Sequence, residues 1–380
     1  MASMTPRERL LTVLSGGVPD CVPVSPDFSN MLPCRLTGKP FWDIYLYNDP
    51  PLWRAYIDCA NHYDVDAFFE AYYIDLFGDR QPEAFGWERF IIARDESRIV
   101  TQLSRLEDGK RVWQPTADVF RVADSPGYRI PLEKLGFPPE PERYEPVEGV
   151  KPDMVGPDVV GRIKELLGDR GIVGIGLAGT LALGNPEAIY NYYDNPDKHE
   201  EWAQQRIDAV EEKFRRLMEF PVKPDFFLCG GSGTLVFQTV GIFRQLALPA
   251  VKRAIELATS VGIPTHVHSC GPEAALVKIM AEETDLTVID PLEEPPMGDC
   301  DLAEMKRLYG DKIVLKGNLS TTGLMLRGSA DDVRATVRRC IDAAAEGGGY
   351  ILSTGDQLGR DTPEENMRAM VETCREYGQY

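Results

Sequence analysis

The feature that most constrains the fold is a regular alternation of apolar strands and amphipathic helices after residue 158. Repeated strand and helix units build parallel sheets, because each helix returns the chain to the start of the next strand. Apolar runs predict strands at Gly171 to Ala178, Asp225 to Cys229, Pro264 to Ser269, Leu286 to Asp290, Lys312 to Asn318 and Tyr350 to Ser353. Helical patterns lie between most of them, at Pro196 to Phe220, Phe243 to Val261, Glu273 to Glu283, Leu302 to Tyr309 and Ala330 to Ala345. The fold class is therefore α/β, and the number of units points to a (β/α)8 TIM barrel.

The part of the chain before this alternation follows other patterns. Thr5-Pro6-Arg7-Glu8 predicts a helix start with a capping box. The run from Cys21 to Pro26 is apolar but carries two prolines, which favours a strand near a sheet boundary.

Farther along, an antiparallel appendage is expected. Residues Trp87 to Pro115 alternate between apolar and polar side chains, and Asp108-Gly109 is typical of a hairpin turn. The segment from Phe137 to Asp158 is rich in proline and acidic residues, which indicates an irregular connection. We expect one domain over residues 1–380, with a β-hairpin appendage and irregular connection at 80–150 inside it.

Charge and composition exclude some classes of function. The net charge of −19 would repel nucleic acid and anionic membrane surfaces, so neither is expected as a partner. The eight cysteines form no CxxC pair, and the start of the chain lacks the pattern of a signal peptide. A cytoplasmic protein with reduced thiols is expected. The oligomeric state stays open, a homodimer included.

The run His266-Val267-His268-Ser269-Cys270 offers a set of metal ligands. In an extended strand, positions two residues apart share a face, so these two histidines and the cysteine would point the same way. Imidazole and thiolate both suit Zn²⁺. The alternative is a core histidine beside a buried thiol. A third ligand is needed, and the candidates at strand ends are Cys229, Asp290, Glu293, Glu294 and Asp356.

Further polar residues lie at the predicted carboxyl ends of strands, where barrel enzymes place their chemistry. Asp290 follows an apolar run and is a candidate catalytic residue, as is Asn318, whose amide would meet a substrate. Cys229, Ser232 and Glu293 are candidate substrate-binding residues in the adjoining loops.

Several sequence blocks resemble the uroporphyrinogen decarboxylase superfamily, whose members are (β/α)8 barrels. The blocks are Asn185-Pro186-Glu187, Asn195-Pro196, His268-Ser269-Cys270-Gly271, Lys316-Gly317-Asn318 and the closing GGGYILSTGDQLGRDTPEENMRAM, with a weaker match in MTPRERLLTVLSGGVPDCVPV. True uroporphyrinogen decarboxylases carry a signature of the type Arg-Gln-Ala-Gly-Arg near the first strand. Here that region reads VPVSPDFSNMLPCRLTGKP, so the signature is absent.

The resemblance is closer to the branch of corrinoid-dependent methyltransferases. In that branch a His-X-Cys pair binds zinc, which implies His268 and Cys270 as ligands here. A second cysteine near the C-terminus completes the family site, and its position is occupied by Asp356. A carboxylate makes a harder site than a thiolate, which favours a methyl ether over a thiol as the reacting group. His266 is a further candidate ligand or a hydrogen-bonding residue.

The resemblance therefore implies a zinc-dependent methyltransferase that moves a methyl group between a small methylated substrate and a separate corrinoid protein. The chain lacks a corrinoid-ligating Asp-X-His-X-X-Gly motif, because Trp202 replaces the glycine after His199. The cobamide would come from the partner, and His199 is expected at the surface. The alternatives are a cofactor-free decarboxylase acting on a carboxylated tetrapyrrole or small acid, and a non-catalytic metabolite-binding barrel.

Overall fold

The computed structural model describes residues 3–71, 74–78 and 85–380, and the chain divides into two compact units. The first, the sheet-and-helix unit, comprises Met1–Asp27, Ala60–Tyr72 and Val160–Tyr380. The second, the antiparallel unit, comprises Phe28–Cys59 and Tyr73–Val159. The antiparallel unit thus includes the predicted 80–150 appendage together with residues nearer the N-terminus.

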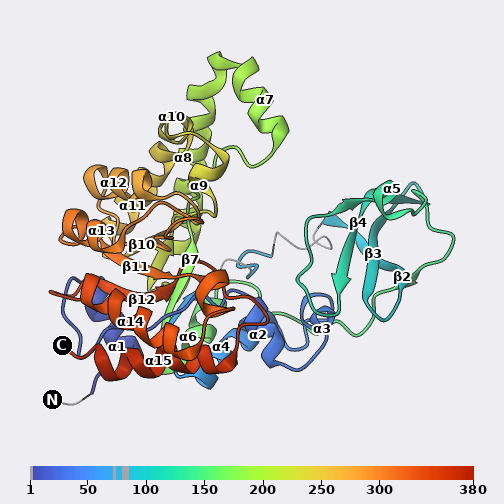
Figure 1. Cartoon of the computed structure of the whole chain (residues 1–380). Coiled ribbons are helices and arrows are strands. Elements are labelled where there is room, and N and C mark those ends of the chain that lie inside the picture. Colours follow the sequence, from blue (N-terminus) through green and yellow to red (C-terminus); the bar gives the residue numbers. More distant parts are fainter. Residues whose placement is uncertain (1–2, 72–73, 79–84) are drawn as a thin grey trace. The chain divides into compact units, whose positions relative to one another are not determined.

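A seven-stranded parallel sheet forms the centre of the first unit, in the order β1-β7-β8-β9-β10-β11-β12 (Figure 1). Its strands are β1 Ala67–Glu70, β7 Gly171–Gly176, β8 Phe226–Leu228, β9 Thr265–His268, β10 Val288–Asp290, β11 Val314–Leu319 and β12 Tyr350–Thr354. Neighbours in the sheet follow one another along the chain, which is the arrangement of a barrel wall. Six of these strands match predicted ones, and β1 was not predicted.

The segment between Cys21 and Ser25 bonds to strands at both edges of this sheet. Ser25 N donates to Leu352 O at 2.8 Å, and Leu352 N donates to Pro23 O at 2.9 Å. On the other side Asp66 N donates to Val24 O at 2.9 Å. Proline has no backbone N–H, so the segment makes two isolated bridges, Cys21 with Gln379 and Val24 with Leu352, rather than a continuous strand. The predicted eight-stranded barrel is therefore confirmed only in part.

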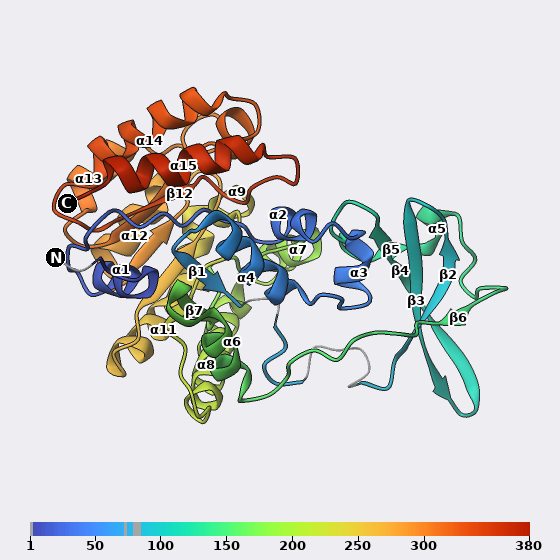
Figure 2. The ribbon, with the colours of Figure 1, turned by 90° about the horizontal axis from the view of Figure 1, so that it is seen from below.

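Helices follow most of the strands. In the first unit they are α1 Pro6–Leu14, α6 Val159–Leu167, α7 Pro186–Asp194, α8 His199–Met218, α9 Thr234–Phe237, α10 Val240–Ile242, α11 Leu248–Ser260, α12 Ala274–Glu283, α13 Leu302–Tyr309, α14 Ala330–Ala344 and α15 Glu364–Tyr377. Short 3-10 segments occur at Gly168–Arg170 and Pro196–Lys198, and π-helical turns at Phe243–Ala247 and Thr321–Met325. Helix α4, Leu52–Tyr63, runs from the second unit into the first. Helices α8 and α11 lie side by side, as Figure 2 also shows.

Aromatic and aliphatic side chains of the parallel strands pack together in a buried cluster. Phe68 and Phe226 lie with ring centroids 4.1 Å apart, in a cluster that also contains Ile172, Val288 and Ile351. Gly174 gives Phe226 its space, because a Cβ there would lie 2.1 Å from the ring. The predicted capping box at the start of α1 is present, with Thr5 as N-cap and Glu8 closing it.

The antiparallel unit holds a five-stranded sheet in the order β5-β4-β3-β2-β6. Its strands are β2 Glu88–Arg94, β3 Arg98–Glu107, β4 Lys110–Arg121, β5 Ile130–Pro131 and β6 Glu145–Pro146, with helices α2 Met31–Leu36, α3 Phe41–Tyr45 and α5 Leu132–Leu135. Asp108 and Gly109 form the predicted turn between β3 and β4, both at positive φ. The antiparallel appendage is thus confirmed.

Two further sequence expectations concern cysteines and membranes. All eight cysteines are free, and seven of them are buried, Cys270 being the half-buried exception. Within the described residues, no helix combines the length and apolar character that crossing a membrane requires.

Candidate metal centre

His268, Cys270 and Asp356 meet at the carboxyl ends of two strands. His268 is the last residue of β9, and Asp356 follows β12 by two residues. One donor atom from each of the three residues lies within 4.8 Å of the others. The Nε2 atom of His268 is 3.7 Å from Oδ1 of Asp356. The sequence singled out these three residues, and the structure brings them together.

Asp290 holds the other side of the His268 ring. Strand register pairs Asp290 with His268 across β9 and β10. The Asp290 carboxylate therefore receives a hydrogen bond from Nδ1 of His268 at 3.0 Å, and another from Nε2 of His266 at 2.9 Å. With Nδ1 engaged, Nε2 of His268 is the nitrogen that faces Cys270 and Asp356. A carboxylate behind a ligating histidine is a common means of fixing its tautomer.

Asp290 and His266 each contact a further charged side chain. Lys316 on β11 forms an ion pair with the second oxygen of Asp290. Nδ1 of His266 lies 3.2 Å from Oε1 of Glu70, at the end of β1. Glu70, His266 and Asp290 form a second group of close donor atoms. Nε2 of His266 donates to Asp290 and Nδ1 lies near the Glu70 carboxylate, so both ring nitrogens face an acidic group.

The electrostatics of the network follow from its pairing. Burial opposes the charge on Asp290, but Lys316 and the two histidines outweigh it and hold the pKa of Asp290 well below its usual range. Burial likewise opposes a charge on His268, but Asp290 raises the pKa of His268 well above its ordinary value. Lys316 stays charged, because Asp290 and Glu70 outweigh the cost of burial and raise its pKa.

The loop after β10 places the carboxyl of Glu293 next to the cluster of His268, Cys270 and Asp356. Oε2 of Glu293 accepts a hydrogen bond from Gly271 N at 2.7 Å, and this carboxyl lies close enough to Asp356 and His268 to feel their charges. Burial raises the pKa of Glu293. Glu273 is fully buried and accepts a hydrogen bond from Leu292 N at 2.9 Å. Burial raises the pKa of Glu273 well above its usual range.

Three other predicted site residues, Asn318, Cys229 and Ser232, are not part of this cluster. Nδ2 of Asn318 donates to Leu292 O at 2.9 Å, and Oδ1 accepts from Cys340, so its amide holds the loop after β10. The Cys229 thiol is fully buried, and burial raises its pKa to about 12, which makes it unreactive near neutral pH. Ser232 is exposed. Substrate roles for Asn318, Cys229 and Ser232 stay predictions.

The glycines after Cys229 nevertheless matter for the centre. Gly231 N donates to His268 O at 2.8 Å. A Cβ at Gly230 would lie 2.2 Å from His268 N, so only glycine lets this loop lie against the end of β9.

Sequence reasoning missed the roles of three ionisable residues, Glu70, Lys316 and Glu273. Glu70 directly follows an apolar run and Lys316 interrupts one, which was the available signal for these two residues. The expectation for His199 was wrong. Its side chain is 8% exposed, stacks on Tyr192 with ring centroids 4.0 Å apart, and bonds to Tyr192 O through Nε2.

The donor set fits zinc. Nitrogen, thiolate and carboxylate are all zinc ligands, and three protein donors with an open fourth position are the pattern of catalytic zinc sites. The Nδ1 bond from His268 to Asp290 supplies the outer support that such ligands have. Asp356 is also held at a φ of 100°, a conformation that side-chain-bearing residues rarely adopt. Strained backbone of this kind gathers at functional sites.

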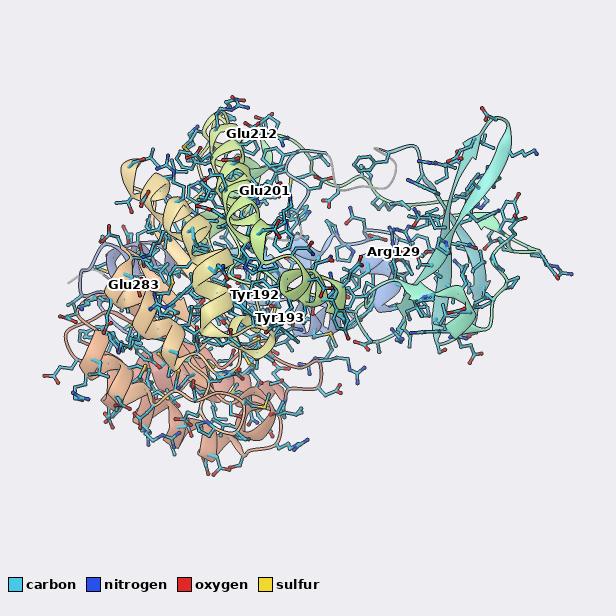
Figure 3. All side chains as sticks on the ribbon, turned by 90° about the horizontal axis from the view of Figure 1, so that it is seen from above. Arg129, Tyr192, Tyr193, Glu201, Glu212 and Glu283 are labelled. Atoms are coloured by element: carbon cyan, nitrogen blue, oxygen red, sulfur yellow. The ribbon has the colours of Figure 1, made fainter. Side chains whose placement is uncertain are left out.

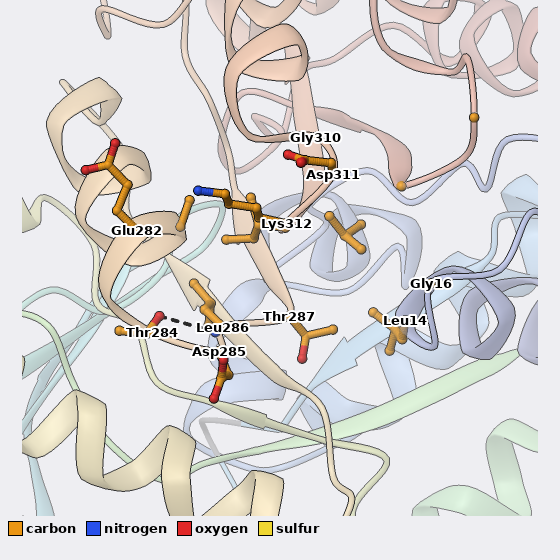
Figure 4. Close-up of a pocket in the computed structure, with 15 residues that line it drawn as sticks. Leu14, Gly16, Glu282, Thr284, Asp285, Leu286, Thr287, Gly310, Asp311 and Lys312 are labelled. Carbon is orange, nitrogen blue, oxygen red and sulfur yellow. Dashed lines mark hydrogen bonds between the residues drawn. The ribbon is translucent and has the colours of Figure 1, made fainter.

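A cavity at the opposite end of the strands does not carry the same chemistry. It has a volume of about 690 Å³ and is lined by residues preceding β10, β11 and β12, among them Thr284, Asp285 and Lys312 (Figure 4). In barrel folds, conserved chemistry lies at the carboxyl ends, so the metal-type cluster defines the candidate site.

Fold and cluster together define an α/β protein of the barrel type with a metal-type centre at the carboxyl ends of its strands. Residues 238–377 match the model of the uroporphyrinogen decarboxylase (URO-D) family. This range contains His268, Cys270, Asp290, Glu293 and Asp356, so the resemblance inferred from the sequence blocks is confirmed for the part of the chain that carries the centre.

Curated relatives include methyltransferases and decarboxylases. The chain is 33% identical over 137 residues to the methylcobamide:CoM methyltransferase MtaA of Methanosarcina barkeri, a match spanning only 36% of either protein. It is 24% identical over 278 residues to a methylated-thiol coenzyme M methyltransferase of Methanosarcina mazei, spanning 69% of this chain and 72% of that protein. A uroporphyrinogen decarboxylase of Anaeromyxobacter dehalogenans is 26% identical over 138 residues, 36% of each protein.

A solved structure supports the fold over the whole chain. The methyltransferase from Methanosarcina mazei superimposes with a TM-score of 0.58 at 18% sequence identity, covering 99% of both chains. Likeness at this identity concerns the fold.

Proposed function

We propose that the protein is a zinc-dependent methyltransferase of a corrinoid system. It moves a methyl group between a small methylated substrate, of the methyl ether kind, and a cobamide carried by a separate protein. The observation that carries this proposal is the cluster of His268, Cys270 and Asp356, with donor atoms within 4.8 Å of one another. The methyltransferase names among the relatives support the reaction class.

His268 through Nε2, Cys270 through its thiolate and Asp356 through a carboxylate oxygen would hold the zinc. The metal would supply Lewis acidity to the heteroatom that bears the methyl group. Glu293 carries a carboxyl that feels the charges of Asp356 and His268, and in this proposal it contacts the bound substrate.

Asp290 acts as a positioning residue in this proposal. It fixes Nδ1 of His268, and its own charge is maintained by Lys316 on the far side. The ring cannot rotate without breaking that bond, so Nε2 stays directed at the metal position. His266 shares the same carboxylate and faces Glu70, which favours its hydrogen-bonding role over a ligand role.

The third ligand bears on the substrate class. Asp356 occupies the position where the resemblance leads one to expect a cysteine. A set of one nitrogen, one sulfur and one oxygen donor is harder than a set with two thiolates and donates less charge to the metal. Such a centre is better suited to polarising an ether oxygen than to activating a thiol, whereas relatives such as MtaA are named for coenzyme M.

The test is an anaerobic methyl transfer assay with zinc-loaded protein and free reduced cobalamin. Candidate donors are methanol, a methoxylated phenol and a methylated thiol, and the absorbance reports conversion of the Co(I) form to methylcobalamin. We expect conversion with an oxygen-bound methyl donor and none after removal of zinc by a chelator. Stepwise loss of carboxylates from uroporphyrinogen would instead establish the decarboxylase, and protein that neither binds zinc nor alters cobalamin would be a binding barrel.

The positioning role of Asp290 predicts a specific loss. Asp290→Asn keeps the shape of the side chain but cannot accept hydrogen bonds from both histidines at one charged oxygen. We expect zinc affinity to fall by roughly 10- to 100-fold, the usual effect of removing such a support. Competition with a chelating dye measures the affinity.

The matched control is Asp299→Asn. Asp299 is exposed and caps α12 through Glu273 N and Ala274 N, so its loss should leave zinc affinity unchanged. Equal zinc affinity in Asp290→Asn and the unaltered protein would contradict the positioning role.

A further inference from the structure

A cavity of about 440 Å³ lies between α7, α8 and the loop after β7. Figure 3 marks these helices through Tyr192 and Tyr193 on α7 and Glu201 and Glu212 on α8. Most of the lining is apolar and comes from alanine and leucine side chains with Trp202, and Arg206 is the cation among the lining residues. The volume lies in the range of small-molecule sites, about 300–1,000 Å³. None of its lining residues belongs to the candidate metal centre.

Arg206 has no anionic partner among the described residues. One terminal nitrogen donates to Gly179 O at 2.8 Å and to Leu181 O at 3.4 Å. The Nε atom is buried without a hydrogen bond to any described residue. Burial alone accounts for the lowered pKa of Arg206, with no neighbouring carboxylate contributing.

Three acidic residues of the same helix, Glu201, Asp208 and Glu212, are engaged with other side chains. Glu201 pairs with Lys198, and Glu212 pairs with Arg215. Asp208 accepts a hydrogen bond from Gln204. A partly buried guanidinium beside apolar surface is unfavourable without a counter-charge, because it has given up part of its hydration. An anion entering the cavity would supply that counter-charge.

We propose that this cavity binds a small organic anion, a carboxylate with an apolar body, whose charged end pairs with Arg206. The planar guanidinium suits a carboxylate because its N–H groups match the two oxygens. The apolar body would lie against Trp202, Leu183 and Leu246, which line the same space. This inference does not rest on the proposed methyltransferase activity.

The fluorescence of Trp202 gives a direct readout. Of the five tryptophans, Trp42, Trp53, Trp87 and Trp113 lie within the ranges of the antiparallel unit, so Trp202 is the one in the sheet-and-helix unit. Benzoate and benzamide are the probes, since they share a shape and differ in charge. We expect benzoate to change the Trp202 emission and to bind at least roughly tenfold more tightly than benzamide, as charge-assisted hydrogen bonds imply. Calorimetry checks both constants.

Two variants and one control complete the test. Arg206→Gln should remove the preference for benzoate, whereas Arg215→Gln, an exposed arginine of the same helix, should preserve it. Ala188→Leu narrows the cavity without touching the guanidinium and should weaken both probes. Equal binding of the two probes, no benzoate binding up to 20 mM (about the weakest detectable range), or an unchanged preference in Arg206→Gln would overturn the proposal.

Discussion

Replacing Cys270 with alanine is expected to remove zinc from the protein and to slow methyl transfer by roughly a thousandfold. The reason is that a catalytic metal contributes several kcal/mol of charge stabilisation, and each 1.4 kcal/mol or so is worth about a factor of ten in rate. Cys270 is half-buried in the cluster and is its single sulfur donor. Zinc content after purification and the cobalamin assay measure the two effects, and His268→Ala should behave alike.

Cys374→Ala is the matched control. Its thiol is buried on α15 and donates to Val22 O, outside the cluster. This variant should keep its zinc. A thermal unfolding curve for each variant shows that the chain is still folded. If Cys270→Ala kept one zinc per chain with the affinity of the unaltered protein, Cys270 would not be a zinc ligand and the proposed metal centre would be wrong.

Substitutions at Asp356 are expected to separate the effect of its backbone conformation on stability from the effect of its side chain on zinc affinity. The residue has a φ of 100°, where glycine is unstrained and a side chain costs on the order of 1–3 kcal/mol. Asp356→Gly should therefore be more stable without metal than Asp356→Ala, by about 1 kcal/mol or more. Both should bind zinc much more weakly than the unaltered protein, because both lack the carboxylate.

The informative third member of this series is Asp356→Cys. It restores a thiolate at the position, so zinc affinity should rise and a thiol such as coenzyme M should become a better methyl acceptor. Denaturant unfolding of the metal-free proteins and chelator competition provide the measurements. If the alanine variant proved as stable as the glycine variant, the backbone at Asp356 would not be strained. If the cysteine variant bound zinc no more tightly, Asp356 would not be a ligand.

Local patterns were enough to predict most of the parallel sheet. Leu302 to Tyr309 was predicted with its observed bounds, and six strands were found because each is a buried apolar run. Strand β1, Ala67–Glu70, was not predicted because it follows helix α4 without a clear boundary signal. The bonds of Pro23 and Ser25 to Leu352 replace a regular strand there. They could not be predicted, because they depend on which distant backbone groups come to lie beside this segment.

The residues of the His268, Cys270 and Asp356 cluster were singled out from the sequence, whereas the charged groups packed behind it were missed. His268, Cys270 and Asp356 were accessible through spacing and resemblance. Lys316 and Glu70 were not, because their meeting with Asp290 and His266 depends on the register of four different strands. His199 was misplaced for a similar reason. The charged sequence around His199 favours an exposed position. The side chain is buried because Tyr192, from the preceding helix, stacks on it.

The hydrogen bonds from residues 23–25 to Leu352 have a consequence for how the chain acquires its structure. They join positions more than three hundred residues apart, so these bonds cannot form until residue 352 has left the ribosome. Contacts of such separation form late and slowly. Until then, the edges at β1 and β12 are open to pairing with other chains. We expect deletion of residues 21–25 to leave the helices intact and to promote aggregation, which light scattering during refolding would report.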